Sequence, residues 1–203
     1  MNYKLSREDN LKIPLFFKLI CFFLFSVSLY INSFHWGIKN LLQFSHFTLI
    51  LLLLGILFNS KLIISMATLA SLPFYISWTV FYLLEILFNL GTLSMAYMFL
   101  DTIPLFVRSF SLFHIFLIPI LLYFHHSFGY VKKSFKYQSL LGVFILWLTY
   151  FISPEKNINW VYGIVTPQNY FHPLIYLMLI SIGLIFLVYL PTHLILKYFF
   201  IED

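Results

Sequence analysis

Six long apolar stretches alternate with short segments that carry most of the charged residues of this 203-residue chain. A helix of roughly 20 apolar residues crosses a hydrocarbon core of about 30 Å, because each residue adds about 1.5 Å. The pattern therefore predicts an all-α fold, a polytopic transmembrane bundle of six helices. The predicted spans are about 13–31, 41–58, 62–88, 104–124, 138–152 and 174–199.

Interior prolines interrupt the third and the sixth of these stretches. Pro73 removes a backbone donor from the third stretch, which is long enough to tilt or bend there, and Pro191 interrupts the sixth. Splitting the third stretch at Pro73 and adding a span from Leu83 to Leu100 gives an alternative with seven helices.

The distribution of positive charge favours six spans. With a cytoplasmic N-terminus, nine Lys and Arg residues fall on or near the cytoplasmic side, and Lys39, Arg108 and Lys156 fall toward the other side. Cytoplasmic loops carry such an excess of positive charge. Seven spans would instead export the lysine-rich loop from Lys132 to Lys136. We therefore predict that both termini are cytoplasmic.

Composition agrees with a membrane protein and excludes several other classes. Hydrophobic residues make up 62% of the chain and charged residues 9%, which is too few to cover a water-soluble surface. The net charge of +5 fits the topology and attraction to anionic headgroups better than it fits nucleic-acid binding. The single cysteine, Cys21, excludes an intramolecular disulfide and a cysteine-based zinc site.

The chain is expected to form one integral membrane domain, 1–203. It shows no internal repeat, no low-complexity tract and no linker, and its loops are too short for an ATP-binding or signalling domain. Lys12 and Lys18 before an apolar run resemble the start of a secretory signal, but no small-x-small cleavage pattern follows. We interpret that run as the first transmembrane helix.

Ionisable residues in or beside the spans are the first candidates for a site, because each costs about 2.5 to 3.5 kcal/mol when it is central in a membrane. Arg108, near the outer end of the fourth span, suits bidentate capture of phosphate or carboxylate. The alternatives are an ion pair with Asp101, seven residues earlier, and snorkelling to the interface. Glu85 lies near the outer end of the third span.

Histidines and a polar loop add to this set. His114 is predicted near the bilayer centre and His46 below the outer end of the second helix, whereas His125, His126 and His193 belong to the cytoplasmic half. The loop "NINWVYG" either forms a wall of an outer cavity or is a simple interfacial turn. The candidate catalytic residues are His46, Glu85, Asp101 and His114, and the candidate substrate-binding residues are Arg108, Asn157, Asn159, Trp160 and His172.

No known chemistry is specified by these residues. Metal-assisted hydrolysis lacks the HExxH or HxxxH spacing, so no metal site is predicted. Ser111 and His114 on one helix fit nucleophilic catalysis only weakly, and ligation of haem by His46 and His114 is conceivable. The cofactor is therefore unknown, and whether the protein is an enzyme stays open.

Several segments nevertheless resemble a known family. They are "YMFLDTIPLFVRSFSLFH", "NINWVYG", "HPLIYL" from His172 and "YLPTHL" from Tyr189. Together they resemble a bacterial family of integral membrane proteins of about this size, over roughly Tyr97 to Leu194. The resemblance implies a six-helix bacterial membrane protein, which we expect in the inner (plasma) membrane. It implies no activity and no catalytic residues.

Two functions remain in view. The first is a multi-pass membrane protein that binds or modifies an anionic, lipid-linked substrate in an outer-leaflet cavity, with membrane lipid as its partner. The second is a non-catalytic membrane subunit or scaffold whose polar residues secure helix packing. Secondary transport is less favoured, since the chain has few helices and no repeat, and haem binding is less favoured because its signal is not specific.

Overall fold

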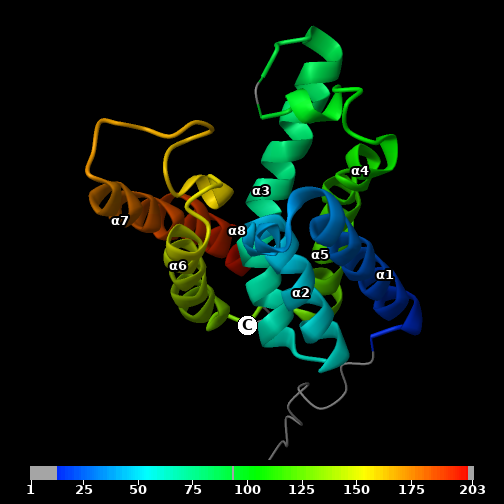
Figure 1. The fold of residues 1–203 in the computed structure, drawn as a ribbon. Coiled ribbons are helices and arrows are strands. Elements are labelled where there is room, and N and C mark those ends of the chain that lie inside the picture. Colours follow the sequence, from blue (N-terminus) through cyan, green and yellow to red (C-terminus); the bar gives the residue numbers. More distant parts are fainter. Residues whose placement is uncertain (1–12, 93, 201–203) are drawn as a thin grey trace, which may run out of the picture.

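The computed structural model describes residues 13–92 and 94–200, and every regular element among them is helical (Figure 1). The predicted all-α fold is confirmed. The α-helices are α1 (Leu15–Ile31), α2 (Phe44–Leu57), α3 (Lys61–Phe88), α4 (Leu105–Phe110), α5 (Phe113–Phe128), α6 (Ser134–Ile152), α7 (Pro173–Gly183) and α8 (Leu190–Phe200). The shorter elements are η1 (Asn32–Trp36), η2 (Ile38–Leu42), η3 (Ala96–Met98), η4 (Ile158–Trp160) and η5 (Leu184–Tyr189).

Five helical stretches are long and apolar enough to cross a membrane: Leu15–Trp36, Lys61–Phe88, Leu105–Phe128, Ser134–Ile152 and Pro173–Phe200. The sixth apolar helix, α2, has 14 residues, or about 21 Å at about 1.5 Å per residue. Each of the six predicted spans thus has a helical counterpart. The terminal residues 1–12 and 201–203 lie outside the described residues, so their predicted cytoplasmic location and the seven-span alternative stay predictions.

Neither interior proline ends its helix. α3 continues through Pro73 as one helix of 28 residues. Before Pro191 the chain forms the π-helical segment η5, whose wider i→i+5 turns accommodate a residue that has no N–H to donate. Helical structure therefore runs from Pro173 to Phe200 without interruption.

At two places the helices extend beyond the predicted spans. The fifth span was expected from Gln138, but α6 begins at Ser134, because Ser134 and Gln138 lie one turn apart on a face that packs inside the bundle. The fourth span is divided into α4 and α5 at Ser111 and Leu112, and α5 continues to Phe128 before Gly129 adopts a positive φ of 77°.

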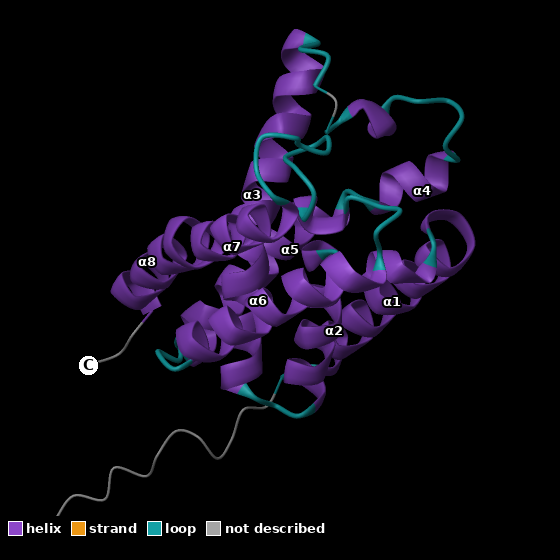
Figure 2. Cartoon of the chain, turned by 60° about the vertical axis from the view of Figure 1, so that its left-hand side comes forward, coloured by secondary structure: helices purple, strands orange, loops and turns teal. Residues whose placement is uncertain are grey.

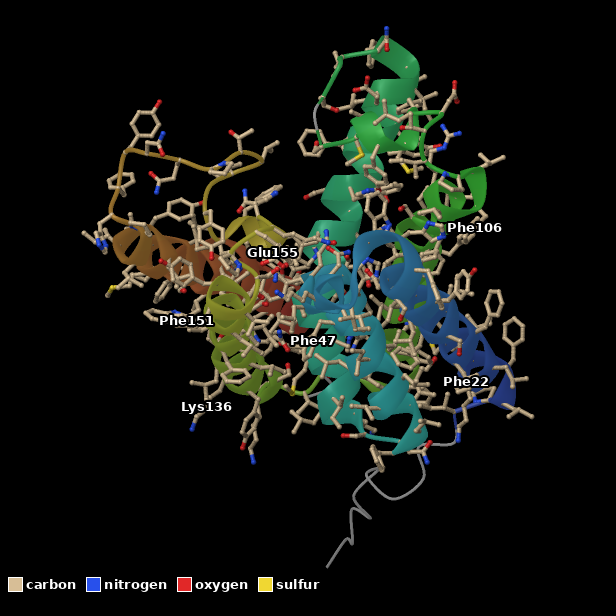
Figure 3. The ribbon with its side chains drawn as sticks, viewed as in Figure 1. Phe22, Phe47, Phe106, Lys136, Phe151 and Glu155 are labelled. Carbon is tan, nitrogen blue, oxygen red and sulfur yellow. The ribbon has the colours of Figure 1, made fainter. Side chains whose placement is uncertain are left out.

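α3 lies at the centre of the packing. α1, α2 and α5 form one core cluster with it, and α6 to α8 form another cluster that includes Leu69 and Leu72 of α3 (Figure 1). Tyr75 and Tyr189 are the largest fully buried side chains of these two clusters. The outward faces carry exposed phenylalanines such as Phe22 and Phe151 (Figure 3). An apolar exterior of this kind suits lipid as the surrounding solvent.

Successive helices bring the loops to two ends of the bundle. We name the end where residues 36–43 meet residues 153–163 the outer end, following the predicted topology, and it carries the longer loops (Figure 2). We name the opposite end the inner end. There the backbone N–H of Tyr130 donates to the carbonyl of Phe200, and that of Val131 donates to Ser65 Oγ.

Candidate functional site

Arg108 lies on the short helix α4 at the outer end, with 15% of its side chain exposed. Its Nη1 donates to the carbonyl of Met98 at 3.3 Å, and Nη2 lies 3.5 Å from a carboxylate oxygen of Asp101. Its Nε is buried and has no hydrogen-bond partner. Guanidinium carries five N–H donors, so two long contacts leave most of its capacity unused.

Asp101 forms the ion pair that the seven-residue spacing suggested, but the pair is weak. The Asp101 side chain is fully exposed, and a separation of 3.5 Å is longer than the 2.7 to 2.9 Å typical of strong charge-assisted hydrogen bonds. Exposed ion pairs of this type contribute roughly 0 to 1 kcal/mol. Asp101 therefore partly neutralises Arg108 without enclosing it.

A series of contacts links the three cations predicted on the outer side. The Tyr97 ring, next to the Met98 carbonyl that binds Arg108, meets the Trp36 ring edge to face at 6.4 Å. The carbonyl of Trp36 in turn accepts from Lys156 Nζ. The neighbour of Lys156, Glu155, accepts from Lys39 Nζ at 2.8 Å, and this bond holds the pKa of the Glu155 carboxyl below its usual value.

His114 is enclosed by aromatic rings. Its imidazole stacks on Trp78 at 4.7 Å and on Phe113 at 4.1 Å, and Tyr75 meets it edge to face at 5.0 Å. Its Nδ1 lies 2.6 Å from the carbonyl of Ser111, and because a carbonyl only accepts, Nδ1 carries the proton. The side chain is 8% exposed, which fits a packing role within the bundle.

His46 borders the same aromatic ring as His114. The His46 ring lies 6.1 Å from that of Phe113, so both histidines share one aromatic neighbour. Its Nδ1 is hydrogen-bonded to Ser28 Oγ at 2.9 Å.

Trp78, which stacks on His114, links this pair of histidines to Tyr97. Its Nε1 donates to the hydroxyl of Tyr97, whose pKa is raised by burial. Through Tyr97 the histidine pair is thus connected to the surface beside Arg108.

Glu85 does not join this group. Its carboxylate accepts from the backbone N–H groups of Gly91 and Thr92 and from Thr92 Oγ1, at 2.9 to 3.1 Å. These bonds close the turn that follows α3, where Asn89 adopts a left-handed conformation. Glu85 is therefore engaged by its own loop.

The three candidate residues of "NINWVYG" also bind protein groups. Asn159 accepts from the backbone N–H of Phe44 at 2.9 Å and donates to the carbonyl of Leu42 at 2.8 Å. Asn157 accepts from the N–H of Tyr162 and donates to the carbonyl of Gly163. Trp160 is 48% exposed, and its carbonyl accepts from the hydroxyl of Tyr176. This loop is thus tied to α2, to itself and to α7.

His172 lies apart from the other candidates, as the exposed N-cap of α7, where its Nδ1 accepts from the N–H of Leu174. Of the nine candidates, the structure brings His46 together with His114 and Arg108 together with Asp101. Glu85, Asn157, Asn159, Trp160 and His172 lie elsewhere.

A polar cluster at the inner end was not among the candidates. Tyr130 Oη lies 2.8 Å from Nδ1 of His193, and the His125 ring meets the Tyr130 ring edge to face at 5.6 Å. Burial raises the pKa of Tyr130 to about 12. The sequence placed these histidines in the inner half, but only the fold brings the C-terminal helix against the loop that contains Tyr130.

Two cavities lie at the outer loop between α6 and α7. One has a volume of about 260 Å³ and the other about 610 Å³, and both are lined by Pro167 and Gln168. Neither is lined by Arg108, His46 or His114. Among the described residues, no group of three or more His, Cys, Asp or Glu side chains could hold a metal ion.

Comparisons with protein-family models, with curated proteins and with solved structures found no match to this chain.

Proposed function

We propose that this chain is a multi-pass protein of the bacterial inner (plasma) membrane that binds an anionic lipid headgroup at its outer end, through Arg108. The observation that carries the proposal is the state of the guanidinium. It is held by a single carbonyl and a weak ion pair, while its Nε is buried without a partner. A phosphate or carboxylate group supplies the acceptors that such a guanidinium lacks.

The surroundings of Arg108 support a lipid as the source of that anion. Phe106 on the same helix and Phe99 in the preceding loop are each 49% exposed, and Leu105 is 70% exposed. Exposed apolar side chains next to a cation match an acyl chain next to a charged headgroup. Lys39 and Lys156 extend the positive surface, and Glu155 offsets one of these charges.

Asp101 faces the same guanidinium and would compete with the headgroup. Because the Asp101 side chain is fully exposed, it can turn into water when an anion arrives. We therefore expect Asp101 to weaken binding and to favour ligands that carry a full negative charge. In this proposal His46 and His114 act as packing residues, since aromatic rings and hydrogen bonds surround them.

The test is retention of phosphatidylglycerol, compared with phosphatidylcholine, by the detergent-purified protein in native mass spectrometry. Arg108→Gln is expected to reduce retention of phosphatidylglycerol about tenfold, and Arg108→Lys to reduce it less, because a lysine keeps the charge but not the planar fork. Asp101→Asn is expected to increase it. Lys136→Gln, an exposed lysine at the inner end, is the matched control and should change nothing (Figure 3).

A non-catalytic scaffold is the second candidate. It is favoured by the engagement of Glu85, Asn157 and Asn159 in bonds that stabilise loops. The same experiment separates the two functions. Unchanged retention of phosphatidylglycerol by Arg108→Gln, together with a lower melting temperature, would leave the scaffold as the function.

A further inference from the structure

We propose that the outer loop between α6 and α7 forms a second site, a cleft that binds a neutral saccharide. The two cavities of about 260 and 610 Å³ adjoin along Pro167 and Gln168, which line both. We infer that they are the two lobes of one cleft. The larger lobe alone falls within the range of about 300 to 1,000 Å³ that ligand pockets commonly span, which accommodates one or two sugar rings.

The lining combines flat apolar rings with uncharged polar groups. Tyr162, Tyr170, Phe171 and Tyr176 supply aromatic surface. Asn157, Thr166, Gln168 and Asn169 supply amides and a hydroxyl; Pro154, Pro167, Pro173 and Ile164 complete the apolar part. Sugar rings present C–H groups on their faces, which pack on aromatic rings, and hydroxyls at their edges, which bind amides and carboxylates.

The charge of the cleft argues for a neutral ligand. Glu155 is the one ionisable acidic or basic side chain in the lining, and its Oε1 accepts from Lys39 Nζ at 2.8 Å. No lysine, arginine or histidine lines either lobe. An anionic ligand would therefore meet the Glu155 carboxylate, whose partner Lys39 does not line the cleft, whereas sugar hydroxyls can donate to that carboxylate.

The cleft is held in shape before any ligand arrives. The hydroxyl of Tyr162 donates to the carbonyl of Tyr150, and the hydroxyl of Tyr176 donates to that of Trp160. Gln168 Oε1 accepts from the N–H groups of Tyr170 and Phe171, which fixes the loop that carries both rings. A preorganised site loses less conformational entropy on binding.

The backbone of the same loop is strained. Val165 has a φ of 62°, which is rare for a β-branched residue. Gly163 has a φ of 154°, and a Cβ there would lie 2.2 Å from the carbonyl oxygen of Thr166. Strained backbone of this kind persists where surrounding contacts enforce it and is concentrated at binding sites. Here those contacts are the bonds from Asn157 and to Tyr162.

Tyr170 is the side chain on which the test depends. It lines the larger lobe while 92% of its surface is exposed, so its ring is available for stacking and makes little contribution to folding. Tyr198 on α8, 82% exposed at the inner end, is the matched control.

The experiment is saturation-transfer NMR of the detergent-purified full chain with glucose, N-acetylglucosamine and maltose. We expect at least one of these sugars to bind to the parent, Tyr170→Ala to weaken its binding about tenfold, and Tyr198→Ala to leave it unchanged. Absence of binding by all three sugars would overturn the proposal. Equal binding by the parent and Tyr170→Ala would overturn it as well, as would preferential binding of a proline-rich peptide in the cleft.

The cleft and the Arg108 site can fail separately. Tyr170→Ala is expected to retain phosphatidylglycerol as the parent does, and Arg108→Gln is expected to bind sugar as the parent does. Loss of both ligands in either variant would show that the two sites are not independent and would overturn the assignment of a separate cleft.

Discussion

The two ends of the bundle differ in how most of their polar side chains are engaged. At the outer end, Glu85, Asn157 and Asn159 bind the backbone of long loops. At the inner end, His125 Nε2, Ser134 Oγ and Gln138 Oε1 are buried between helices without a partner. Long loops contain many backbone groups that no helix satisfies, and side chains supply their partners. Polar residues at the outer end should therefore matter more for stability than those at the inner end.

Asn159→Ala is expected to cause the largest loss of stability. The variant leaves the N–H of Phe44 and the carbonyl of Leu42 without their partner and puts alanine at a φ of 56°. We expect a loss of about 3 kcal/mol in unfolding free energy, from two lost bonds and an unfavourable backbone conformation. Thermal melting in detergent measures it, with the exposed Asn169→Ala as control. Equal losses from the two variants would contradict the role of Asn159.

A smaller loss of unfolding free energy is expected from Gly142→Ala on α6, next to the buried Gln138. A Cβ at Gly142 would lie 2.7 Å from the hydroxyl of Tyr189, which accepts a hydrogen bond from Gln138. Overpacking of this type costs about 1 to 3 kcal/mol. Gly183→Ala is the matched control, because the nearest side-chain atom there, Leu187 Cδ1, lies at 3.9 Å.

The control variant Gly183→Ala is expected to change the melting temperature in the opposite direction. Alanine favours a helix over glycine by about 1 kcal/mol, so Gly183→Ala should raise the melting temperature slightly while Gly142→Ala lowers it. Parallel changes in the two variants would show that close packing at Tyr189 does not govern this part of the bundle.

Two serines at the inner end compare a buried hydroxyl that has a partner with one that has none. Ser134 Oγ is buried without a partner, whereas Ser65 Oγ accepts from the N–H of Val131 at 3.1 Å. Ser134→Ala should be neutral or slightly stabilising, and Ser65→Ala should cost about 1 kcal/mol, because it leaves a backbone N–H without its acceptor. Chemical unfolding of both variants measures the difference. A larger loss in Ser134→Ala would reveal a partner for its hydroxyl and remove the contrast between the ends.

Helix positions followed from the sequence because burial in lipid depends on local composition. The runs that became α1 and α3 are predominantly apolar, and both ends of α3 were placed within one residue. The start of α6 was missed because Lys132, Lys133 and Lys136 made the segment look like a loop. Only the packed structure shows that Ser134, between these lysines, faces the interior.

Much less of the site could be predicted. The pair of Asp101 and Arg108 followed from spacing along one segment, whereas the shared neighbour of His46 and His114, Phe113, was not predicted. The partners of Asn159 lie 115 and 117 residues away, at Phe44 and Leu42. No local pattern encodes contacts across such separations, so a polar loop looks the same whether it lines a cavity or ties helices together.

The smallest expected effect concerns the outer ion pair between Glu155 and Lys39, and it depends on pH. The hydrogen bond from Lys39 holds the pKa of Glu155 below the ordinary value of about 4.3. A lowered folded-state pKa adds stability that is fully present above the unfolded-state pKa and is lost as pH falls through the folded-state pKa. The difference in melting temperature between the parent and Glu155→Gln should therefore be small and constant above about pH 5.5 and should shrink below about pH 4.

Salt gives a second check on the same ion pair. The side chains of Lys39 and Glu155 are both more than 40% exposed, so 1 M NaCl should also reduce the difference in melting temperature. A difference that grows as the solution becomes more acidic would mean that Glu155 is stabilised in its protonated form, and the ion pair would then not add to the bonds that join residues 36–43 to the outer loop.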